Sequence, residues 1–189
     1  MAVLTILRMG HPVLREKAKL IGPEELQSRE LLTLVEDMFE TMAAYEGIGL
    51  AAPQIGVSKQ LAIVGIPEDN PRYPDAPETK QYVIINPKIK ILDTKLQGFW
   101  EGCLSVPGLR GHVERPRKLQ IDFTTLAGNI ERIVVEDFVS TVFQHELDHL
   151  EGKLYIDRIK DTRKLAFNEE YDSFLCPDRD KDKNNEDTP

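Results

Sequence analysis

The chain has 189 residues, 41% of them hydrophobic, which is enough to bury the core of one domain without disulfide bonds. Two cysteines are too few for a disulfide framework, and we expect no disulfide partner, signal peptide, transit peptide or membrane association. A cytoplasmic location is therefore expected. The net charge of −8 argues against a broad nucleic-acid-binding surface.

Turn residues and apolar spacing predict the first elements. Pro12 suits the start of a short helix over residues 11–15. Apolar residues then recur at helical spacing from about residue 23 to 45, which predicts an amphipathic helix that ends before Gly47. Residues 47–56 carry three glycines and a proline, so we expect a tight loop whose backbone can be approached closely.

The middle of the chain is rich in β-branched and apolar residues between turn signals, which predicts strands. The expected strands are residues 60–66, 81–86, 88–96, 118–124 and 129–135. A proline-rich loop, Pro67–Pro77, should separate the first two. The last two should form a hairpin across residues 126–129.

A buried helix is predicted after the hairpin, with Asp137 as a candidate N-cap and Gly152 as a stop. It is apolar on almost every side, through Phe138, Val139, Val142, Phe143, Leu147 and Leu150. A weaker helical pattern runs on to about residue 175. The remaining residues, 176–189, are almost wholly polar and charged, and we expect a disordered tail there.

The buried helix carries the motif H-E-x-x-H at residues 145–149. At 3.6 residues per turn, His145 and His149 lie on one face, as two ligands of one metal ion must. Glu146 lies about 100° round the helix from His145, close enough to reach a water at the metal without being a ligand. A short motif also arises by chance, but histidines and carboxylates inside a core are costly unless they are paired or coordinated.

A catalytic metal needs a third protein ligand and an open position. Glu151 is two residues past His149, on the wrong side of the helix. Cys103 is the better candidate, because a thiolate is a strong ligand for iron or zinc. The alternative for a lone cysteine is a small buried hydrophobe.

Three segments together resemble the peptide deformylase family. They are G-x-G-L-A-A-x-Q at residues 47–54, E-G-C-L-S at 101–105 and Q-H-E-x-D-H-L-x-G at 144–152. The resemblance implies a catalytic domain over residues 1–175. It also implies an α+β fold, a single compact domain in which antiparallel and mixed sheets pack around a buried central helix carrying H-E-x-x-H. The implied activity is removal of the N-terminal formyl group from formyl-methionyl nascent polypeptides, with release of formate.

The same resemblance implies the catalytic parts. Cys103, His145 and His149 would hold the metal, which the family points to as Fe²⁺, although Zn²⁺ or Ni²⁺ suits such a site equally. Glu146 would take a proton from the water and deliver it to the methionine nitrogen. The Gln54 side chain and the Leu104 backbone N–H would donate hydrogen bonds to the oxyanion.

Substrate contacts are expected from two glycines and from an apolar pocket. Gly49 and Gly102 would let an extended peptide pair with the backbone. The methionine side chain needs an apolar pocket, for which we expect the walls Phe99, Phe138 and Val142, although each also suits plain core packing. Asp148 and Arg115 are expected to pair behind the ligands. Arg110 could close the pocket mouth, but a surface arginine is the simpler interpretation.

Two other functions fit parts of the sequence. An H-E-x-x-H peptidase that cleaves internal peptide bonds would share the helix and Glu146 but not Cys103 as a ligand. A non-catalytic module near the ribosomal exit with a structural metal would need a closed, four-ligand site. Ribosome contact is left open as a partner interaction. No chemistry is assigned to His11, Trp100, His112 or Cys176.

Overall fold

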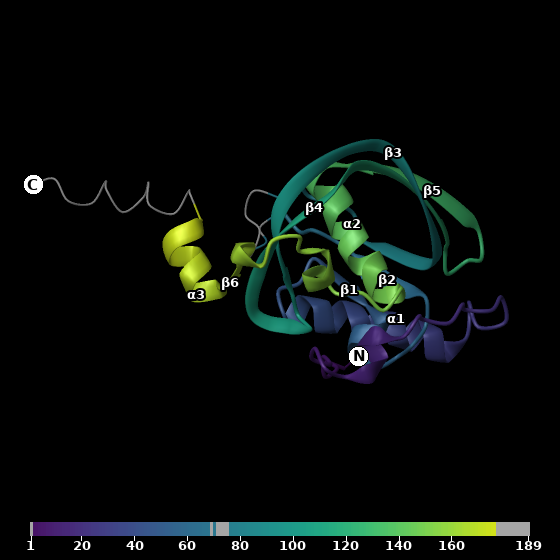
Figure 1. Cartoon of the computed structure of the whole chain (residues 1–189). Helices are drawn as coiled ribbons and strands as arrows, with labels where there is room; N and C mark the ends of the chain where they lie inside the picture. Colours follow the sequence, from purple (N-terminus) through teal and green to yellow (C-terminus); the bar gives the residue numbers. More distant parts are fainter. Residues whose placement is uncertain (1, 69, 71–75, 177–189) are drawn as a thin grey trace, which may run out of the picture.

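One antiparallel sheet dominates the computed structural model, which describes residues 2–68, 70 and 76–176 (Figure 1). Its strands are adjacent in chain order: β1 (Gly49–Ala51), β2 (Leu61–Val64), β3 (Tyr82–Cys103), β4 (Val106–Thr124) and β5 (Ile130–Glu136), while β6 (Leu165–Phe167) pairs with β4. Every ladder between these strands is antiparallel. The prediction of a single α+β domain with an antiparallel sheet is confirmed.

The long strands β3 and β4 correct the strand boundaries. The segments expected separately at 81–86 and 88–96 belong to one strand of 22 residues, which continues to Cys103. Register shifts near Asp93 and at the Gly102–Cys103 step interrupt its pairing with β4, and such irregularities bend a strand. The predicted hairpin is confirmed by the pairing of Thr124 with Ile130, but β4 begins twelve residues before its expected start.

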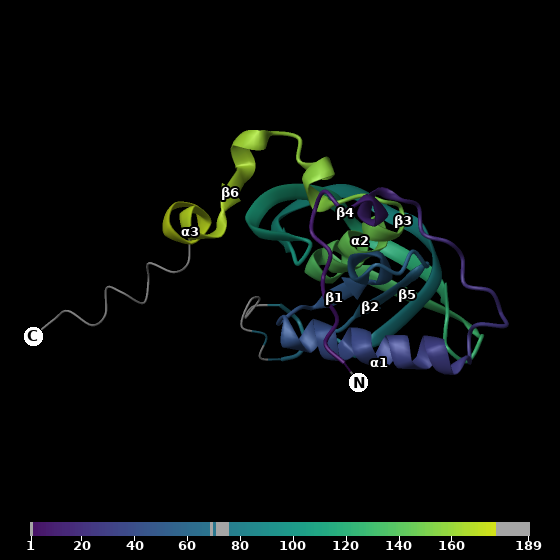
Figure 2. The ribbon, with the colours of Figure 1, turned by 90° about the horizontal axis from the view of Figure 1, so that it is seen from below.

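Two helices cover opposite faces of β1 and β2. Successive strand residues point to opposite faces, and in β2 Ala62 and Val64 belong to the core around α2 (Asp137–Leu150). Leu61 and Ile63 instead belong to the core around α1 (Arg29–Ala44). Figures 1 and 2 show α2 enclosed by the curved strands and α1 on the far side of β1 and β2. Burial on both faces explains why β2 is a continuous apolar run.

The N-terminal helices differ in extent from their predictions. Residues 12–15 form the expected short helix, η1 (Pro12–Arg15). α1 begins at Arg29, not near residue 23, because Ser28 Oγ accepts the backbone N–H of Leu31 and caps the helix there. After α1, the left-handed conformation is adopted by Glu46, with φ 53°, and not by a glycine. The predicted loop at 47–56 is instead β1 followed by the short helix η2 (Ala52–Ile55).

The N-cap of α2 lies one residue earlier in the chain than expected. Glu136 occupies the N-cap position, and Asp137 is the first helical residue, with φ 54°. Every residue from Ser140 to Leu150 is buried. Gly152 follows the helix in a left-handed conformation, with φ 69°, as expected of a helix stop.

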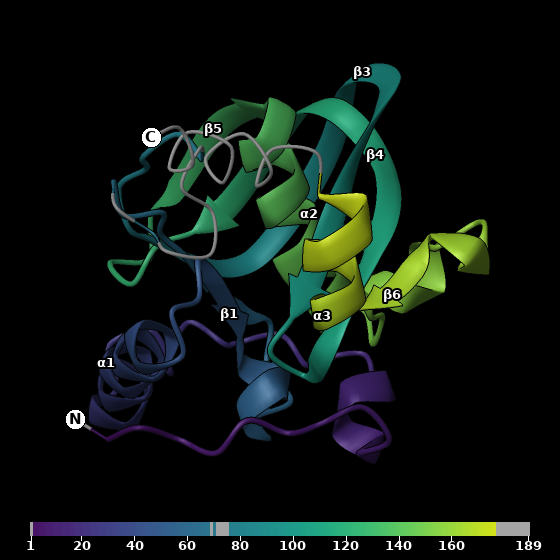
Figure 3. The same ribbon diagram turned by 90° about the vertical axis from the view of Figure 1, so that its left-hand side faces the viewer.

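The segment after α2 is not the helix that its apolar spacing predicted. It consists of η3 (Tyr155–Arg158), η4 (Thr162–Lys164), β6, α3 (Asn168–Glu170) and the π-helical turn η5 (Tyr171–Leu175). We call residues 165–175 the C-terminal arm; Figure 3 shows it outside the sheet beside β4. The expected disordered tail, apart from Cys176, lies outside the described residues. Within the described part of the chain, no helix is long and apolar enough to cross a membrane.

Candidate active site

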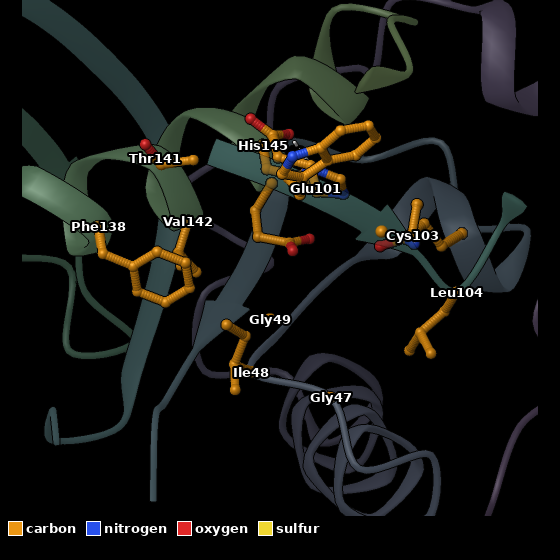
Figure 4. Close-up of a pocket in the computed structure, with 14 residues that line it drawn as sticks. Gly47, Ile48, Gly49, Glu101, Cys103, Leu104, Phe138, Thr141, Val142 and His145 are labelled. Carbon is orange, nitrogen blue, oxygen red and sulfur yellow. Dashed lines mark hydrogen bonds and ion pairs between the residues drawn. The ribbon is translucent and has the colours of Figure 1, made fainter. Parts of the chain in front are cut away.

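A pocket opens between β1, the end of β3 and α2 (Figure 4). β1 and the residue pair before it contribute Gly47, Ile48 and Gly49, and η2 contributes Gln54. The remaining lining residues come from the end of β3, from Leu104 directly after it and from α2: Trp100, Glu101, Gly102, Cys103, Leu104, Phe138, Thr141, Val142, His145 and Glu146. Three distant sequence segments therefore meet at one cavity.

Three potential metal ligands lie together at this pocket. The ligand atoms of Cys103, His145 and His149 are all within 4.8 Å of one another, and all three residues are buried. Cys103 Sγ lies 3.4 Å from His149 Nε2. A cysteine and two histidines form a donor set that suits Fe²⁺, Zn²⁺ or Ni²⁺, so the residues fit a single metal ion.

The electrostatics of the cluster favour a thiolate. Burial alone would raise the pKa of the Cys103 thiol, but the neighbouring His149 and His145 outweigh it and hold that pKa well below its ordinary value. Burial likewise would lower the pKa of His145, yet hydrogen bonds to Cys103 and Glu101 raise it well above the usual value. A thiolate is the form of cysteine that binds metals.

Glu101 fixes the orientation of His145. Its Oε2 lies 2.8 Å from His145 Nδ1, and because a carboxylate can only accept, Nδ1 donates and Nε2 is left for a metal. Burial would raise the pKa of Glu101, but His145 and Arg115 together hold it below its ordinary value. Sequence reasoning missed this role, although Glu101 precedes Cys103 by two residues and therefore shares its face of the strand.

Arg115 ties Glu101 to α2. Its guanidinium donates to both Glu101 oxygens, at 2.6 and 3.0 Å, and to Asp148 Oδ2 at 2.7 Å, so the predicted pairing of Arg115 with Asp148 is confirmed. Arg158 also binds Asp148. Burial opposes the charge on Arg115, but Glu101 and Asp148 raise its pKa further above the usual value. The buried ions hold the strand that carries Cys103 against the helix that carries the histidines.

Removing Arg115 should strongly destabilise the protein. We expect Arg115→Met to lower the free energy of unfolding by about 3–5 kcal/mol, because two buried carboxylates lose a partner. The matched control is Arg117→Met, whose pair with Asp137 is about half exposed and should contribute far less to stability, because solvent screens it. Urea unfolding of both variants measures the difference. Equal losses would show that the buried ions contribute no more than a surface pair.

Glu146 faces the pocket beside the ligands. A Cβ at Gly49 would lie 2.4 Å from Glu146 Oε1, so only glycine at this position of β1 leaves room for the carboxylate. Glu146 Oε2 is buried without a hydrogen-bond partner among the described residues. Burial raises the pKa of Glu146 to about 7, although His145 and His149 act in the opposite direction. The carboxylate is thus free to exchange a proton with a molecule in the pocket.

The carboxamide of Gln54 has a fixed orientation. The backbone N–H of Ala51 donates to it over 2.8 Å, so the acceptor Oε1 must lie on that side. Nε2 then faces Ser105 Oγ at 3.3 Å and Cys103 Sγ at 3.5 Å. Nε2 carries two hydrogens. With one directed to Ser105, the other points toward Cys103 Sγ in the metal-ligand cluster.

The N-terminal segment bridges η2 and the turn between β3 and β4, which both border this cluster. The backbone N–H of Leu7 donates to Gln54 O, and that of Met9 donates to Ser105 O, each over 2.7 Å. Ser105 is fully buried. The segment 7–9 therefore bridges η2, which carries Gln54, and the turn that carries Leu104 and Ser105, and so fixes their separation.

Apolar side chains line the pocket on the side away from the metal ligands. Phe138 and Val142, two of the three expected walls, line it together with Ile48 and Thr141, which sequence reasoning did not name. The third, Phe99, is not among the lining residues and instead packs edge-on against Phe138, with ring centres 5.4 Å apart. Figure 4 shows Phe138, Val142 and Ile48 facing the same space. Phe99 therefore supports the wall from behind.

The cavity combines a place for one metal ion, a carboxylate that is not a ligand and an open side between two strand edges. Those are the parts of a metal-dependent hydrolase, in which the ion keeps a position for water or substrate and a neighbouring carboxylate moves protons.

Comparisons with known proteins identify the family. Residues 3–165 match the family model described as polypeptide deformylase. The chain is 46% identical over 173 residues to a peptide deformylase of Leptospira biflexa, covering 92% of this chain and 97% of that protein. It is also 46% identical over 175 residues to peptide deformylase 1 of Bordetella pertussis, covering 93% and 96%. The chain belongs to the peptide deformylase family, metal-dependent hydrolases that remove the formyl group from nascent polypeptides.

Solved structures agree with this assignment. A class I type b peptide deformylase from Acinetobacter baumannii, bound to Met-Ala-Ser, is similar with a TM-score of 0.80 and 40% identity. The similarity covers 84% of this chain and 99% of that one. The fold and the family therefore rest on both sequence and structure.

Proposed function

We propose that this chain deformylates formyl-methionyl peptides with Fe²⁺ held by Cys103 at the end of β3 and by His145 and His149 on α2, the helix that carries H-E-x-x-H. The observation that carries the proposal is the meeting of the cysteine with both histidines in one buried cluster. It also favours deformylase over an H-E-x-x-H peptidase, whose third ligand would lie downstream of the helix. A divalent cation bound there would act as a Lewis acid, polarising the formyl carbonyl and lowering the pKa of water.

The side chains around the cluster divide the work of amide hydrolysis. Glu146 accepts a proton from the attacking water while the oxygen of that water bonds to the formyl carbon. The oxyanion that forms accepts hydrogen bonds from Gln54 Nε2 and the Leu104 backbone N–H. When the C–N bond breaks, Glu146 delivers the proton to the methionine nitrogen, and formate and a free amino terminus are released.

The peptide binds as an added strand between β1 and β3. Gly49 and Gly102 lie on the two strand edges that border the pocket, so the substrate backbone can pair with either side. The methionine side chain then points inward to Phe138 and Val142, with Phe99 behind them. The A. baumannii deformylase bound to Met-Ala-Ser supports a peptide that begins with methionine as the ligand.

The direct test is formate release from formyl-Met-Ala-Ser by protein purified without oxygen. Release of one formate for each new free amino terminus supports the proposal. Cleavage of an internal peptide bond without formate would support the peptidase instead. Metal analysis of Cys103→Ala decides the ligand set, since full metal binding by that variant would contradict the role of the thiolate.

The iron form should lose activity in air. Fe²⁺ bound to a thiolate with an open position exposes both a redox-active metal and an oxidisable sulfur to dioxygen, whereas nickel presents no such combination. We expect oxidation of Cys103 and loss of metal in the iron form, and an intact nickel form. Both forms, prepared under argon, are exposed to air and compared by formate release and by the mass of the Cys103 peptide. Equal survival with unmodified Cys103 would contradict the expectation.

The setting of the enzyme follows from its substrate. Formylated nascent chains arise at the ribosome, so we propose a cytoplasmic enzyme that meets its substrate near the exit tunnel. Both cysteines are free, in keeping with a reducing compartment. Co-sedimentation of the protein with ribosomes in low salt, compared with protein alone, tests the association; sedimentation that is independent of ribosomes would contradict it.

A further inference from the structure

An aromatic cluster lies at the rim of the pocket, where the C-terminal arm meets the sheet. The ring of Trp100 on β3 lies 5.0 Å from the ring of Tyr171 in the arm and 5.9 Å from that of His112 on β4, measured between centres. The guanidinium of Arg110 lies 5.2 Å from the centre of the Tyr171 ring. Trp100 itself lines the catalytic pocket. Trp100 therefore connects Tyr171 of the C-terminal arm with the pocket.

The register of β3 and β4 places this cluster on the outer face of the sheet. Trp100 pairs with His112, and Gly102 pairs with Arg110, so each pair shares a face. Glu101, between Trp100 and Gly102, points to the opposite face, where it binds His145. Trp100 and the arm are therefore on the other side of the strand from the metal ligands.

A peptide added to this edge would present alternate side chains to the two faces. With the methionine side chain inward against Phe138 and Val142, the side chain of the next residue points outward. Gly102 offers no side chain there, which leaves the space open. Trp100 lies on the same face of β3, two residues before Gly102, a diagonal distance that aromatic side chains span.

We propose that Trp100 and Tyr171 form the subsite for the residue that follows formyl-methionine, and that this subsite favours aromatic side chains. The inference rests on the proposed function, because it takes the peptide to be an added strand at the deformylase site. Trp100 supplies the contact surface. Tyr171 positions it from the arm, while the ring of His112 fills the space above Gly98, where a Cβ would lie 2.3 Å from His112 Cε1.

The first test compares formyl-Met-Phe-Ser with formyl-Met-Ala-Ser by formate release. Because an aromatic pair contributes beyond simple burial, wild type should prefer the phenylalanine peptide roughly five- to tenfold in kcat/KM, mainly through KM. Trp100→Ala and Tyr171→Ala should reduce this ratio to within about twofold, while Tyr171→Phe, which keeps the ring, should retain it. The matched control, Phe174→Ala, removes a ring of the same arm that is 82% exposed and should leave the ratio unchanged.

The second test reads binding without turnover. Trp100 is the single tryptophan of the chain, so intrinsic fluorescence reports on this subsite alone. Titration with the product Met-Phe-Ser should change the emission more than Met-Ala-Ser at equal saturation. This readout in wild type and Tyr171→Ala remains decisive should Trp100→Ala fail to fold.

The possible failures are distinguishable. Absence of formate from both peptides would contradict the deformylase assignment. Formate release from both with equal kcat/KM, or a preference that persists in folded Tyr171→Ala and Trp100→Ala, would overturn the subsite and leave the deformylase assignment intact.

Discussion

Glu146→Gln should keep its metal and lose nearly all turnover, about 10²–10⁴-fold in kcat, the usual contribution of general acid–base catalysis. The amide has nearly the shape of the carboxylate and fits the same space beside Gly49, but it cannot accept the proton of the attacking water. Formate release and metal content, measured on the same preparation, separate catalysis from metal binding.

The control for this variant is Glu151→Gln. Glu151 follows α2 and forms a surface ion pair with Lys17. The Glu151→Gln substitution therefore removes the same charge as Glu146→Gln, but at a residue that does not line the pocket. We expect normal kcat for that variant. Activity of Glu146→Gln within tenfold of wild type would exclude Glu146 as the group that moves the proton.

Gln54→Ala should lower kcat by roughly 10²–10³-fold, the typical effect of removing one oxyanion donor, with a smaller change in KM. Gln54→Glu gives the sharper comparison. A carboxylate can still accept the Ala51 N–H, as Oε1 does in the wild type, but it offers no N–H to the oxyanion. We therefore expect the glutamate variant to be at least as impaired as the alanine variant.

A purely structural role for Gln54 predicts the reverse order. If the residue served only to hold Ala51, glutamate would restore activity and alanine would not. Gln27→Ala, at an exposed position, controls for the loss of a glutamine as such. A change confined to KM in both Gln54 variants would make Gln54 a substrate-binding residue and not an oxyanion donor.

The sequence by itself determined the features that depend only on residues close together in the chain. The spacing of His145 and His149 follows from the period of a helix, and the hairpin between β4 and β5 follows from two β-rich segments around a short turn. The motifs also named Cys103 and Gln54, because three short segments together are specific even though none of them is sufficient alone. The α+β class followed from the family resemblance that these three motifs carry.

Tertiary structure alone decided the features that depend on contacts between distant segments. Glu101 binds both His145 and Arg115 only because β3 and β4 pair in a register that brings it against α2, whereas the pairing of Arg115 with Asp148 was predicted. The orientation of Gln54 depends on the Ala51 N–H and on Ser105, which no periodicity reveals. Phe99 has the same apolar character as Phe138, yet it lies behind the pocket wall.

The C-terminal arm shows most clearly where prediction from local sequence pattern fails. Its apolar spacing predicted one helix to about residue 175, but Leu165–Phe167 pair with β4 as a strand, and only short helical turns follow. A short helix in isolation is only marginally stable. Hydrogen bonds between β6 and β4 and the ring contact between Tyr171 and Trp100 therefore outweigh the helical preference of this segment. The sequence therefore named the three potential metal ligands, whereas the folded chain determined which residues orient them and which ones line the pocket.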